Sequence, residues 1–556
     1  MSRLLSRLFG RRSEARNKAA GSSVILNDGI PKTIEEATGR YPYLAEYIER
    51  LPEKPRYVVN LDLELRMGEE ANIIYPLGKG IFIHVVRGEA EGKYNIIEPP
   101  KPPLETLMAV ESAVGRLINE ETPGESPMDE LISLYYLAKK KKMFKVKLGG
   151  REEDYLLYHF LREKVGYGFL EGFLADPYLE DISIPGAGNI FVFHRIFGSL
   201  ETNIHILGGE IDRVLRGIAE RFGKILSYSN PIVDIHLPDG SRFNIVFGED
   251  ISLRGSNFTI RKFAREPISI AHLIRWRTIS AEASAYLWML FDVGVSALIC
   301  GETASGKTTT LNALTAFIRH DAKVVSIEET PEVNLFHKNW VREVTRLHTG
   351  SPVTMFDLLK AALRQRPDYI IVGEIRGEEG KIAFQAIETG HPVISTMHAG
   401  SMEQLLQRLT SHPIDVPKTH ISSLNLAIFQ ARIERNGKLI RRVLSVNEVL
   451  GYDPSEDRIV FLPTIIYDPD RDSHDFMRMS YLLENVVLRF RGWGRENLPD
   501  LYGELDMRME ILKYLAEKRP RYVDVFRTVI EVNNRGVKAV YDDIREDKTP
   551  WLNEDK

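Results

Sequence analysis

The spacing of apolar residues changes along the chain, and the changes divide it into regions. Within residues 71–86, two runs of strand-forming residues flank "PLGKG", which predicts a β-hairpin. Apolar positions at helical spacing predict helices in 102–120 and 151–166. We interpret residues 1–30 as a basic, flexible terminus and 31–150 as a mixed α/β N-terminal region without a recognisable catalytic motif.

A compact α/β module is predicted over residues 151–263. Its strand patterns, "DISIPG" and "NIFVFHR", precede a helix with five apolar residues on one face: Ile211, Val214, Leu215, Ile218 and Phe222. Apolar and polar residues alternate on both sides of "PDG" (233–247), which predicts a second hairpin. The segment "AREPIS" (264–269) that follows predicts a hinge, within a linker over 264–272.

After the linker, strand, loop and helix patterns repeat. This repeat is typical of a parallel sheet covered by helices and predicts an α/β domain over residues 273–475. Residues 476–556 show mainly helical patterns, so we interpret them as a helical C-terminal extension.

The segment "GETASGKTTT" (301–310) matches the phosphate-binding pattern G-x-x-x-x-G-K-[ST]. It follows the apolar strand "SALIC" and opens a helix, so backbone N–H groups and the helix dipole would face the phosphates of ATP. Lys307 would reach the β and γ phosphates, and the Thr308 hydroxyl would bind Mg²⁺. The predicted nucleotide-binding residues are Gly301, Glu302, Thr303, Ala304, Ser305, Gly306, Lys307, Thr308 and Thr309.

Three later strands also end in ionisable residues. "KVVSI" runs into Glu328 and Glu329, "YIIV" is followed by Glu374, and "PVIST" is followed by His398. Ligands bind at the carboxyl ends of parallel strands, so these side chains would surround the γ-phosphate if their strands lie parallel to "SALIC". Hydrolysis needs one group to hold Mg²⁺ and another to orient water. Each acid alone also fits a charge at a helix N-terminus.

Composition limits the alternatives. The net charge of −5 argues against a protein that coats nucleic acid, and the single cysteine, Cys300, excludes internal disulfides and cysteine-only metal clusters. The longest nearly apolar run, 287–300, is too short to span a bilayer, and no secretory signal is visible. We therefore expect a cytoplasmic protein.

The first 16 residues combine arginines with four apolar residues at helical spacing: Leu4, Leu5, Leu8 and Phe9. Such a segment would lie on an anionic membrane or dock on a partner, although a solvated terminus has the same composition.

Four motifs occur in a characteristic order: "GETASGKTTT", "VVSIEETPE", "RQRPDYIIVGEIRG" and "TGHPVISTMHAG". They resemble the Walker A, aspartate, Walker B and histidine boxes of the ATPases of type II secretion, type IV pili and related machines. The resemblance extends over about residues 150–465 and is strongest to the archaeal branch, which includes the archaellum motor. It implies an α/β fold: a RecA-like P-loop ATPase domain, a smaller α/β N-terminal domain and a helical C-terminal extension.

The resemblance also implies residue roles. Glu328 would activate water, Glu374 would be the Walker B acid that holds Mg²⁺, and His398 would sense the γ-phosphate. One departure leaves the catalytic acid open, because the family's Glu-Asp pair is Glu328-Glu329 in this chain.

Arginines of the N-terminal domain would stabilise charge on the transferring phosphoryl group, as fingers do in other phosphoryl-transfer enzymes. Arg254 and Arg261 are the candidates, with Arg242 as a third. Surface ion pairing would explain them equally simply.

At the level of function, the family implies a homohexameric ATPase, peripheral on the inner face of the cell membrane, where residues 1–16 could bind anionic lipid. Hinge motion would drive a polytopic membrane platform protein that assembles an archaellum, a pilus or a secretion filament. Two alternatives stay open: a conjugation-type nucleic-acid translocase, against which the acidic composition argues, and an ATP-binding scaffold without turnover. We expect no nucleic-acid partner.

Overall fold

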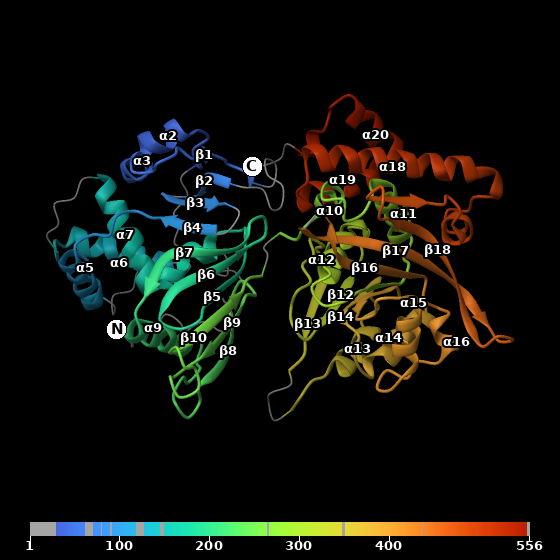
Figure 1. The fold of residues 1–556 in the computed structure, drawn as a ribbon, viewed down its shortest axis with the longest axis horizontal. Coiled ribbons are helices and arrows are strands. Elements are labelled where there is room, and N and C mark those ends of the chain that lie inside the picture. Colours follow the sequence, from blue (N-terminus) through green and yellow to red (C-terminus); the bar gives the residue numbers. More distant parts are fainter. Residues whose placement is uncertain are drawn as a thin grey trace. The chain divides into compact units, whose positions relative to one another are not determined.

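The computed structural model describes residues 29–61, 71–78, 80–88, 92–117, 127–144, 150–263, 266–346, 351–435 and 438–552. The chain divides into two compact units, residues 1–265 and 266–556 (Figure 1). The division falls at the predicted hinge, of which residues 264 and 265 lie outside the described residues. The predicted lipid-binding segment, 1–16, lies outside them as well.

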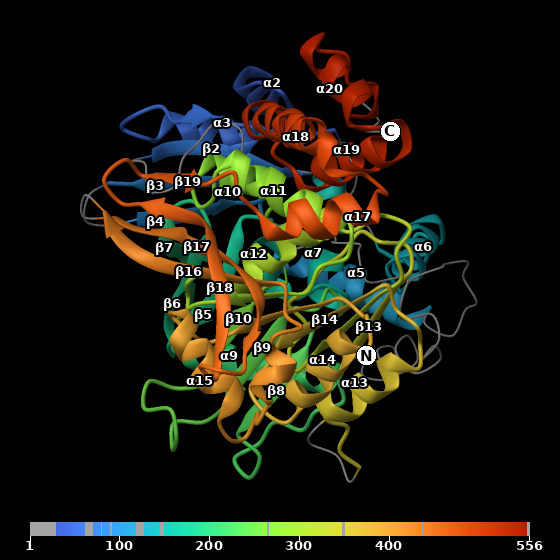
Figure 2. The ribbon, with the colours of Figure 1, turned by 90° about the vertical axis from the view of Figure 1, so that its right-hand side faces the viewer.

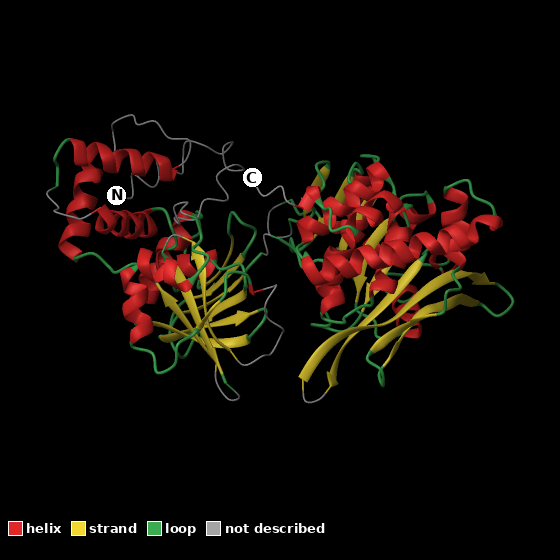
Figure 3. Ribbon diagram, turned by 90° about the horizontal axis from the view of Figure 1, so that it is seen from above, coloured by secondary structure: helices red, strands yellow, loops and turns green. Residues whose placement is uncertain are grey.

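The first unit is built on one ten-stranded sheet, whose strands are yellow in Figure 3. The strand order is β1-β2-β3-β4-β7-β6-β5-β10-β9-β8. Both predicted hairpins are confirmed, since β2 pairs with β3 and β8 with β9 in antiparallel register. The strands are β1 (Arg56–Tyr57), β2 (Ala71–Gly78), β3 (Ile81–Arg87), β4 (Gly92–Ile97), β5 (Leu179–Ile184), β6 (Gly188–His194), β7 (Gly198–Ile206), β8 (Ile232–His236), β9 (Arg242–Val246) and β10 (Asn257–Arg261).

Helices pack on this sheet as their apolar faces predict. In α9 (Gly208–Arg221), Ile211, Leu215 and Ile218 are buried, and Val214 and Phe222 pack against the same core. The remaining helices are α2 (Ile34–Arg40), α3 (Pro42–Glu49), α5 (Leu104–Arg116), α6 (Pro127–Lys140), α7 (Gly150–Lys164) and α8 (Glu171–Ala175).

Residues 31–150 and 151–263, which sequence patterns separate, share this sheet and one core. Strand β4 pairs in parallel with β7. The carboxylate of Asp176, fully buried, accepts hydrogen bonds from the hydroxyls of Tyr75 (2.6 Å) and Tyr94 (2.7 Å). Because these contacts join segments about a hundred residues apart, periodicity along the chain cannot reveal them.

The second unit contains a nine-stranded sheet, with the order β13-β12-β14-β15-β11-β16-β17-β18-β19. The strands from β13 to β16 are mutually parallel. The strands are β11 (Ala297–Cys300), β12 (Val324–Glu328), β13 (Trp340–Val344), β14 (Tyr369–Glu374), β15 (Val393–Met397), β16 (Leu426–Arg435), β17 (Lys438–Asp453), β18 (Arg458–Asp468) and β19 (Ser473–Phe476).

The parallel sheet predicted within residues 273–475 is confirmed for β11 to β16, but the sheet continues with antiparallel strands that were not predicted. Strands β16 to β19 form an antiparallel meander, in which each strand pairs with the next one along the chain.

Helices cover both faces of this sheet, as Figure 2 shows for the second unit. Alternate residues of each parallel strand enter two separate cores. Ile299 and Ile371 join α10–α12 and the C-terminal helices, whereas Leu298 and Ile370 join α13–α16. The helices are α10 (Ile270–Arg275), α11 (Ala281–Asp292), α12 (Lys307–Leu314), α13 (Met355–Leu363), α14 (Glu379–Glu388), α15 (Met402–Thr410) and α16 (Lys418–Ile421).

The C-terminal extension is helical, as predicted, and belongs to the core of the second unit. Leu505 and Leu512 of α18 are buried in the same cluster as Leu311 and Leu314 of α12. The extension comprises α17 (Leu488–Phe490), α18 (Leu498–Lys518), α19 (Tyr522–Arg535) and α20 (Val537–Arg545). No helix of the described residues is both long and apolar enough to cross a membrane.

Candidate functional site

The phosphate-binding loop joins the end of β11 to the start of α12. Gly306 has φ 96° and is the N-cap of α12. A Cβ on Gly301 would collide with the carbonyl oxygen of Gln430, and one on Gly306 would lie 2.9 Å from the Gln430 side chain. Ala304 also adopts a positive φ, 62°. The glycines therefore let the loop pass close to its neighbours, with the N-terminus of α12 free of any capping side chain.

Lys307 begins α12 and is largely buried. Its Nζ donates to the carbonyl oxygen of Glu302 (3.0 Å), within the same loop. Burial lowers the pKa of Lys307, and the Glu374 carboxylate opposes that effect. Glu374 is therefore near enough to act electrostatically on Lys307, as the predicted site requires.

Two residues of the antiparallel part of the sheet also contact the loop region. Thr310 Oγ1 donates to Gln430 Oε1 (2.6 Å), and Arg441 Nε donates to the carbonyl oxygen of Ala304 (3.1 Å). Neither Gln430 nor Arg441 could be predicted as a loop contact, because nothing in the sequence around them indicates that β16 lies beside β11.

The predicted common edge of the strands is confirmed. Strands β11, β12, β14 and β15 are parallel, so their carboxyl ends lie at one edge of the sheet. Glu328 ends β12, Glu374 ends β14, and His398 follows β15. The structure thus brings these three residues to the edge where the phosphate-binding loop leaves β11.

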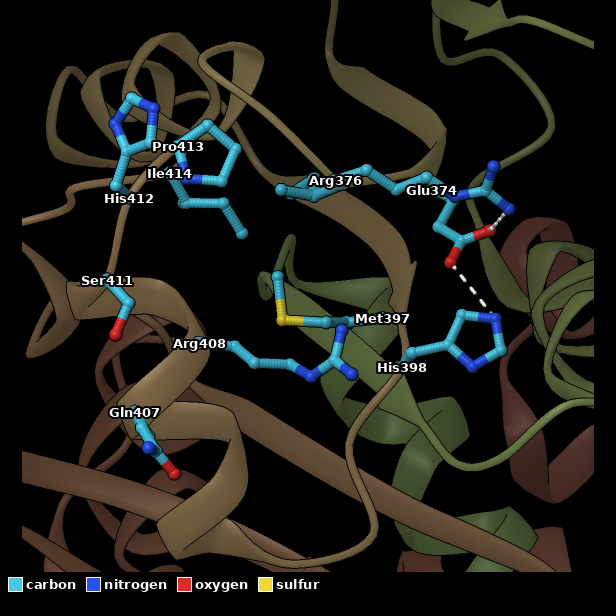
Figure 4. A pocket seen from close by; sticks show the side chains of 11 residues that line it. Glu374, Arg376, Met397, His398, Gln407, Arg408, Ser411, His412, Pro413 and Ile414 are labelled. Atoms are coloured by element: carbon cyan, nitrogen blue, oxygen red, sulfur yellow. Dashed lines mark hydrogen bonds and ion pairs between the residues drawn. The ribbon is translucent and has the colours of Figure 1, made fainter.

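Glu374 lies between a histidine and an arginine in Figure 4. Its Oε2 accepts from Arg376 Nη2, and its Oε1 lies 3.3 Å from His398 Nε2. The second contact has ion-pair distance but not hydrogen-bond geometry, so Oε1 is a buried acceptor without a hydrogen-bond partner. Burial and then Lys307 lower the pKa of His398, so the imidazole is neutral at pH 7.

A cavity of about 570 Å³ opens beside this cluster. Glu374, Arg376 and His398 line it together with Gln407 and Arg408 of α15. In Figure 4 the Arg408 guanidinium extends towards His398. The cavity thus joins two cations, a carboxylate and a neutral imidazole, a combination suited to the charged end of a phosphate chain.

Glu328 is buried, with 1% of its surface exposed. Its Oε1 accepts from the backbone N–H groups of Glu332 and Val333, both at 2.7 Å, whereas Oε2 has no hydrogen-bond partner and lies 3.7 Å from Arg342 Nε. Burial raises the pKa of Glu328 to about 7. The neighbouring Glu329 is exposed.

Glu332 is a further carboxylate near the site, in addition to the predicted Glu328 and Glu374. Asn312 of α12 holds its segment, donating from Nδ2 to the carbonyl oxygen of Glu332 (2.9 Å) and accepting from the N–H of Asn334 (3.0 Å). Burial lowers the pKa of Lys307, and Glu332, like Glu374, opposes that effect; Glu332 also adds to the raised pKa of Arg376, which the hydrogen bond to Glu374 mainly causes. Its position four residues after Glu328 in "EETPE" was the available signal.

The predicted arginines belong to the first unit. Arg261 and Arg242 lie directly opposite each other on β10 and β9, and Arg261 faces Asp181 on β5. Arg254 precedes β10 and accepts, through its carbonyl oxygen, from the N–H of Ala187 (3.1 Å). Arg254 and Arg261 therefore lie at opposite ends of β10, in a unit other than that of the phosphate-binding loop.

The other predicted loop residues differ in exposure. Glu302, Thr303 and Ala304 are exposed, and Thr308 and Thr309 are half-buried in the first turn of α12. Ser305 is buried and donates to the Glu302 carbonyl oxygen (2.8 Å), so its hydroxyl stabilises the loop itself.

Comparisons with known proteins identify the family. The model of the "Type II/IV secretion system protein" family matches residues 163–444. An uncharacterised protein of Methanocaldococcus jannaschii is 42% identical over 517 residues, which cover 87% of this chain and 94% of the relative. This chain belongs to the type II/IV secretion system protein family.

Two more distant similarities cover smaller parts of the chain. Conjugal transfer protein TrbB of Rhizobium radiobacter is 31% identical over 246 residues, 43% of this chain and 74% of the relative. The Legionella pneumophila ATPase DotB matches with a TM-score of 0.37 and 16% identity, over 69% of this chain and 96% of DotB.

Proposed function

We propose that the protein is an ATP-hydrolysing, homohexameric motor at the inner face of the cytoplasmic membrane. It would power a polytopic platform protein that assembles a pilus-like or archaellum filament, or a type II-like secretion filament. The observation that carries the proposal is the meeting of Lys307, Glu374 and His398 beside the phosphate-binding loop. A loop that only bound nucleotide would need Lys307 but not the other two.

The residues present fit ATP and Mg²⁺. Gly301 and Gly306 occupy loop positions at which a Cβ would come too close to Gln430. Glu374 has a buried oxygen without a hydrogen-bond partner. ATP with Mg²⁺ supplies a phosphoryl group whose transfer to water releases free energy. Lys307 would neutralise phosphate charge, Thr308 and Glu374 would hold the metal, and His398, neutral at pH 7, would contact the γ-phosphate end.

Glu328 is the proposed base that orients and activates water. Its pKa of about 7 matches a general base at neutral pH, whereas Glu329 is exposed. Glu332 is the competing candidate because its charge acts on Lys307. Phosphate release by Glu328→Gln, Glu329→Gln and Glu332→Gln would identify the base as the residue whose variant loses turnover but keeps ATP affinity.

We further propose that Arg254 and Arg261 stabilise charge on the transferring phosphoryl group, with motion at 264–269 coupling hydrolysis to movement of the first unit. Arg254→Ala and Arg261→Ala would then lower turnover about 10³-fold or more, as loss of an arginine finger does, with little change in ATP affinity. Arg242→Ala tests the third candidate, which lies opposite Arg261 on β9. Normal turnover in all three variants would remove the arginines from the mechanism.

The central test is Mg²⁺-dependent phosphate release by the purified full chain, with and without membranes that contain the platform protein. Glu374→Gln should keep ATP binding and lose about 10²–10³-fold in turnover. Glu378→Gln, an exposed change four residues away, is the matched control. Lys307→Ala should abolish tight nucleotide binding. Near-normal turnover in Glu374→Gln would contradict the proposal.

Two other functions predict different results. The similarity to TrbB favours testing a nucleic-acid translocase, for which DNA rather than membranes would stimulate turnover. A scaffold that only binds ATP would release no phosphate under any condition. Deleting the gene and imaging surface filaments and motility would then assign the cargo.

A further inference from the structure

The backbone that follows Glu328 supplies the hydrogen bonds that hold this side chain. Residues 331–337 lie between β12 and β13 and belong to no helix or strand. Within them, the N–H groups of Glu332 and Val333 both donate to Glu328 Oε1, at 2.7 Å. The orientation of the Glu328 carboxylate therefore depends on what fixes residues 332–334, the donor segment.

Asn312 of α12 is largely buried and bonds the donor segment with both ends of its amide. Its Nδ2 donates to the carbonyl oxygen of Glu332 (2.9 Å), and its Oδ1 accepts from the N–H of Asn334 (3.0 Å). The peptide group between Glu332 and Val333 is thus shared, because its C=O accepts from Asn312 while its N–H donates to Glu328. Asn312 and Glu328 are connected through one peptide group.

Other contacts anchor this stretch of chain without setting the direction of its peptide groups. The side chain of Val333 is fully buried in the core that contains Leu311. Further along, His337 Nε2 donates to the carbonyl oxygen of Ile318 (3.2 Å). Apolar packing is non-directional, and the bond of His337 lies beyond the donor segment. Loss of the Asn312 amide would therefore leave the segment in place and free its peptide groups to turn.

The surroundings of Glu328 make these donors matter. Burial raises the pKa of Glu328 to about 7, and the two backbone hydrogen bonds oppose that effect. Two charged side chains also act on it: Arg342 on β13, with Nε 3.7 Å from Oε2, lowers the pKa, and Glu332 raises it. On the side of β14, Gly373 adjoins Glu328 and bears no side chain. Loss of the backbone bonds would raise the pKa further, because they stabilise the charged carboxylate.

We propose that Asn312 is a positioning residue for hydrolysis, whose amide holds the peptide groups that orient the carboxylate of Glu328. The inference rests on the proposed function, in which Glu328 is the base. Helix α12 also begins with Lys307, so one helix fixes both the phosphate-binding lysine and the orientation of the base. Asn312 would govern turnover without touching the phosphates, since a misplaced catalytic group costs up to about 10²-fold in rate.

The first test compares Mg²⁺-dependent phosphate release by the full chain and by two variants. Asn312→Leu keeps the size of the side chain and removes both bonds. Asn312→Asp has the same shape, keeps the acceptor for Asn334 and loses only the donor to Glu332. In both variants kcat at pH 7 should fall about tenfold or more, with KM for ATP within about twofold. The acidic limb of the pH profile should move up by about one unit, so that higher pH restores part of the turnover.

His337→Leu is the structural control, because it removes a hydrogen bond of the same stretch of chain that does not involve the donor segment. It should lower the melting temperature and leave kcat and the pH profile unchanged. An equal shift of the profile in His337→Leu would show that any loosening of this stretch acts on Glu328, and would overturn the specific role of Asn312.

The second test does not depend on hydrolysis. The melting temperature of Glu328→Gln relative to its parent should grow with pH until Glu328 is ionised in the folded chain, to about pH 7. With Asn312→Leu in both chains, the difference should go on growing to about pH 8.

The proposal is overturned if both Asn312 variants keep the wild-type kcat and pH profile, or if the melting-temperature difference stops growing at the same pH in both backgrounds. Absence of phosphate release from wild type would instead contradict the proposed function. The melting temperatures would then still decide whether Asn312 controls Glu328.

Discussion

Two buried glutamates of the second unit, Glu328 and Glu448, differ in how their oxygens are used. Glu448 on β17 is fully buried, and its Oε1 accepts from the hydroxyls of Tyr286 (2.6 Å) and Ser480. Its Oε2 accepts from the N–H of Leu482 (3.1 Å). Glu328, equally buried, leaves Oε2 without a hydrogen-bond partner, as Glu374 does with Oε1.

The difference separates a structural acid from candidate catalytic ones. A buried acceptor without a partner costs about 1–3 kcal/mol, so folds rarely keep one without a reason. Glu448 joins β17, α11 and the start of the C-terminal extension and leaves nothing available for chemistry. Glu328 and Glu374 retain unused acceptors at the edge of the sheet that carries the phosphate-binding loop.

The largest expected loss of stability is for replacement of Glu448, the structural acid. Glu448→Ala would leave two hydroxyls and one N–H buried without an acceptor, and should lower the free energy of unfolding by about 3–5 kcal/mol. Chemical denaturation followed by tryptophan fluorescence measures it. Glu448→Gln, which keeps an acceptor oxygen, should cost less. If the alanine variant unfolded at the wild-type denaturant concentration, the structural role of Glu448 would be wrong.

Glu328→Gln should have an intermediate effect on the free energy of unfolding. At neutral pH and above, it should raise this free energy, whereas Glu448→Ala lowers it. The pKa of Glu328 is about 7 in the folded chain against an ordinary value of 4.5, so the folded state holds the proton to higher pH. This contribution to stability is complete below about pH 4.5 and is lost as the pH rises through 7. Glutamine cannot ionise and avoids the loss, so the variant should be more stable than wild type by about 3 kcal/mol at pH 8.

Melting temperatures of wild type and Glu328→Gln between pH 5 and pH 8 check this prediction. The difference should shrink towards pH 5, where the wild-type carboxyl is protonated and resembles the amide. A constant difference across the range would show that Glu328 does not titrate there. Glu329→Gln, at an exposed position, should show no such dependence and serves as the control.

The smallest change in the free energy of unfolding is expected for Tyr286→Phe. It removes one of three donors to Glu448 and keeps the ring, so the loss in the free energy of unfolding should be about 1–2 kcal/mol. Denaturation under the conditions used for Glu448→Ala measures it. A loss as large as that of Glu448→Ala would mean that Tyr286, rather than the carboxylate, holds the extension in place.

Most local elements of this chain could be predicted, because hairpins and amphipathic helices depend on neighbouring residues. The hairpin at 71–86 and the apolar face of α9 are examples. The meander from β16 to β19 was missed, although Asn436-Gly437 is a favourable hairpin dipeptide. The strand–helix repeat that precedes the meander is typical of a parallel sheet, and it gives no sign that the last strands are antiparallel.

The sequence by itself determined the phosphate-binding loop and the order of the acids and the histidine at the strand ends. Both follow from short motifs and from the rule that parallel strands end at one edge of a sheet. Only the tertiary structure decided which acids keep unused oxygens, that Gln430 and Arg441 contact the loop region, and that a side chain of α12 bonds the donor segment. These features depend on contacts between residues up to 137 positions apart, which local patterns do not encode.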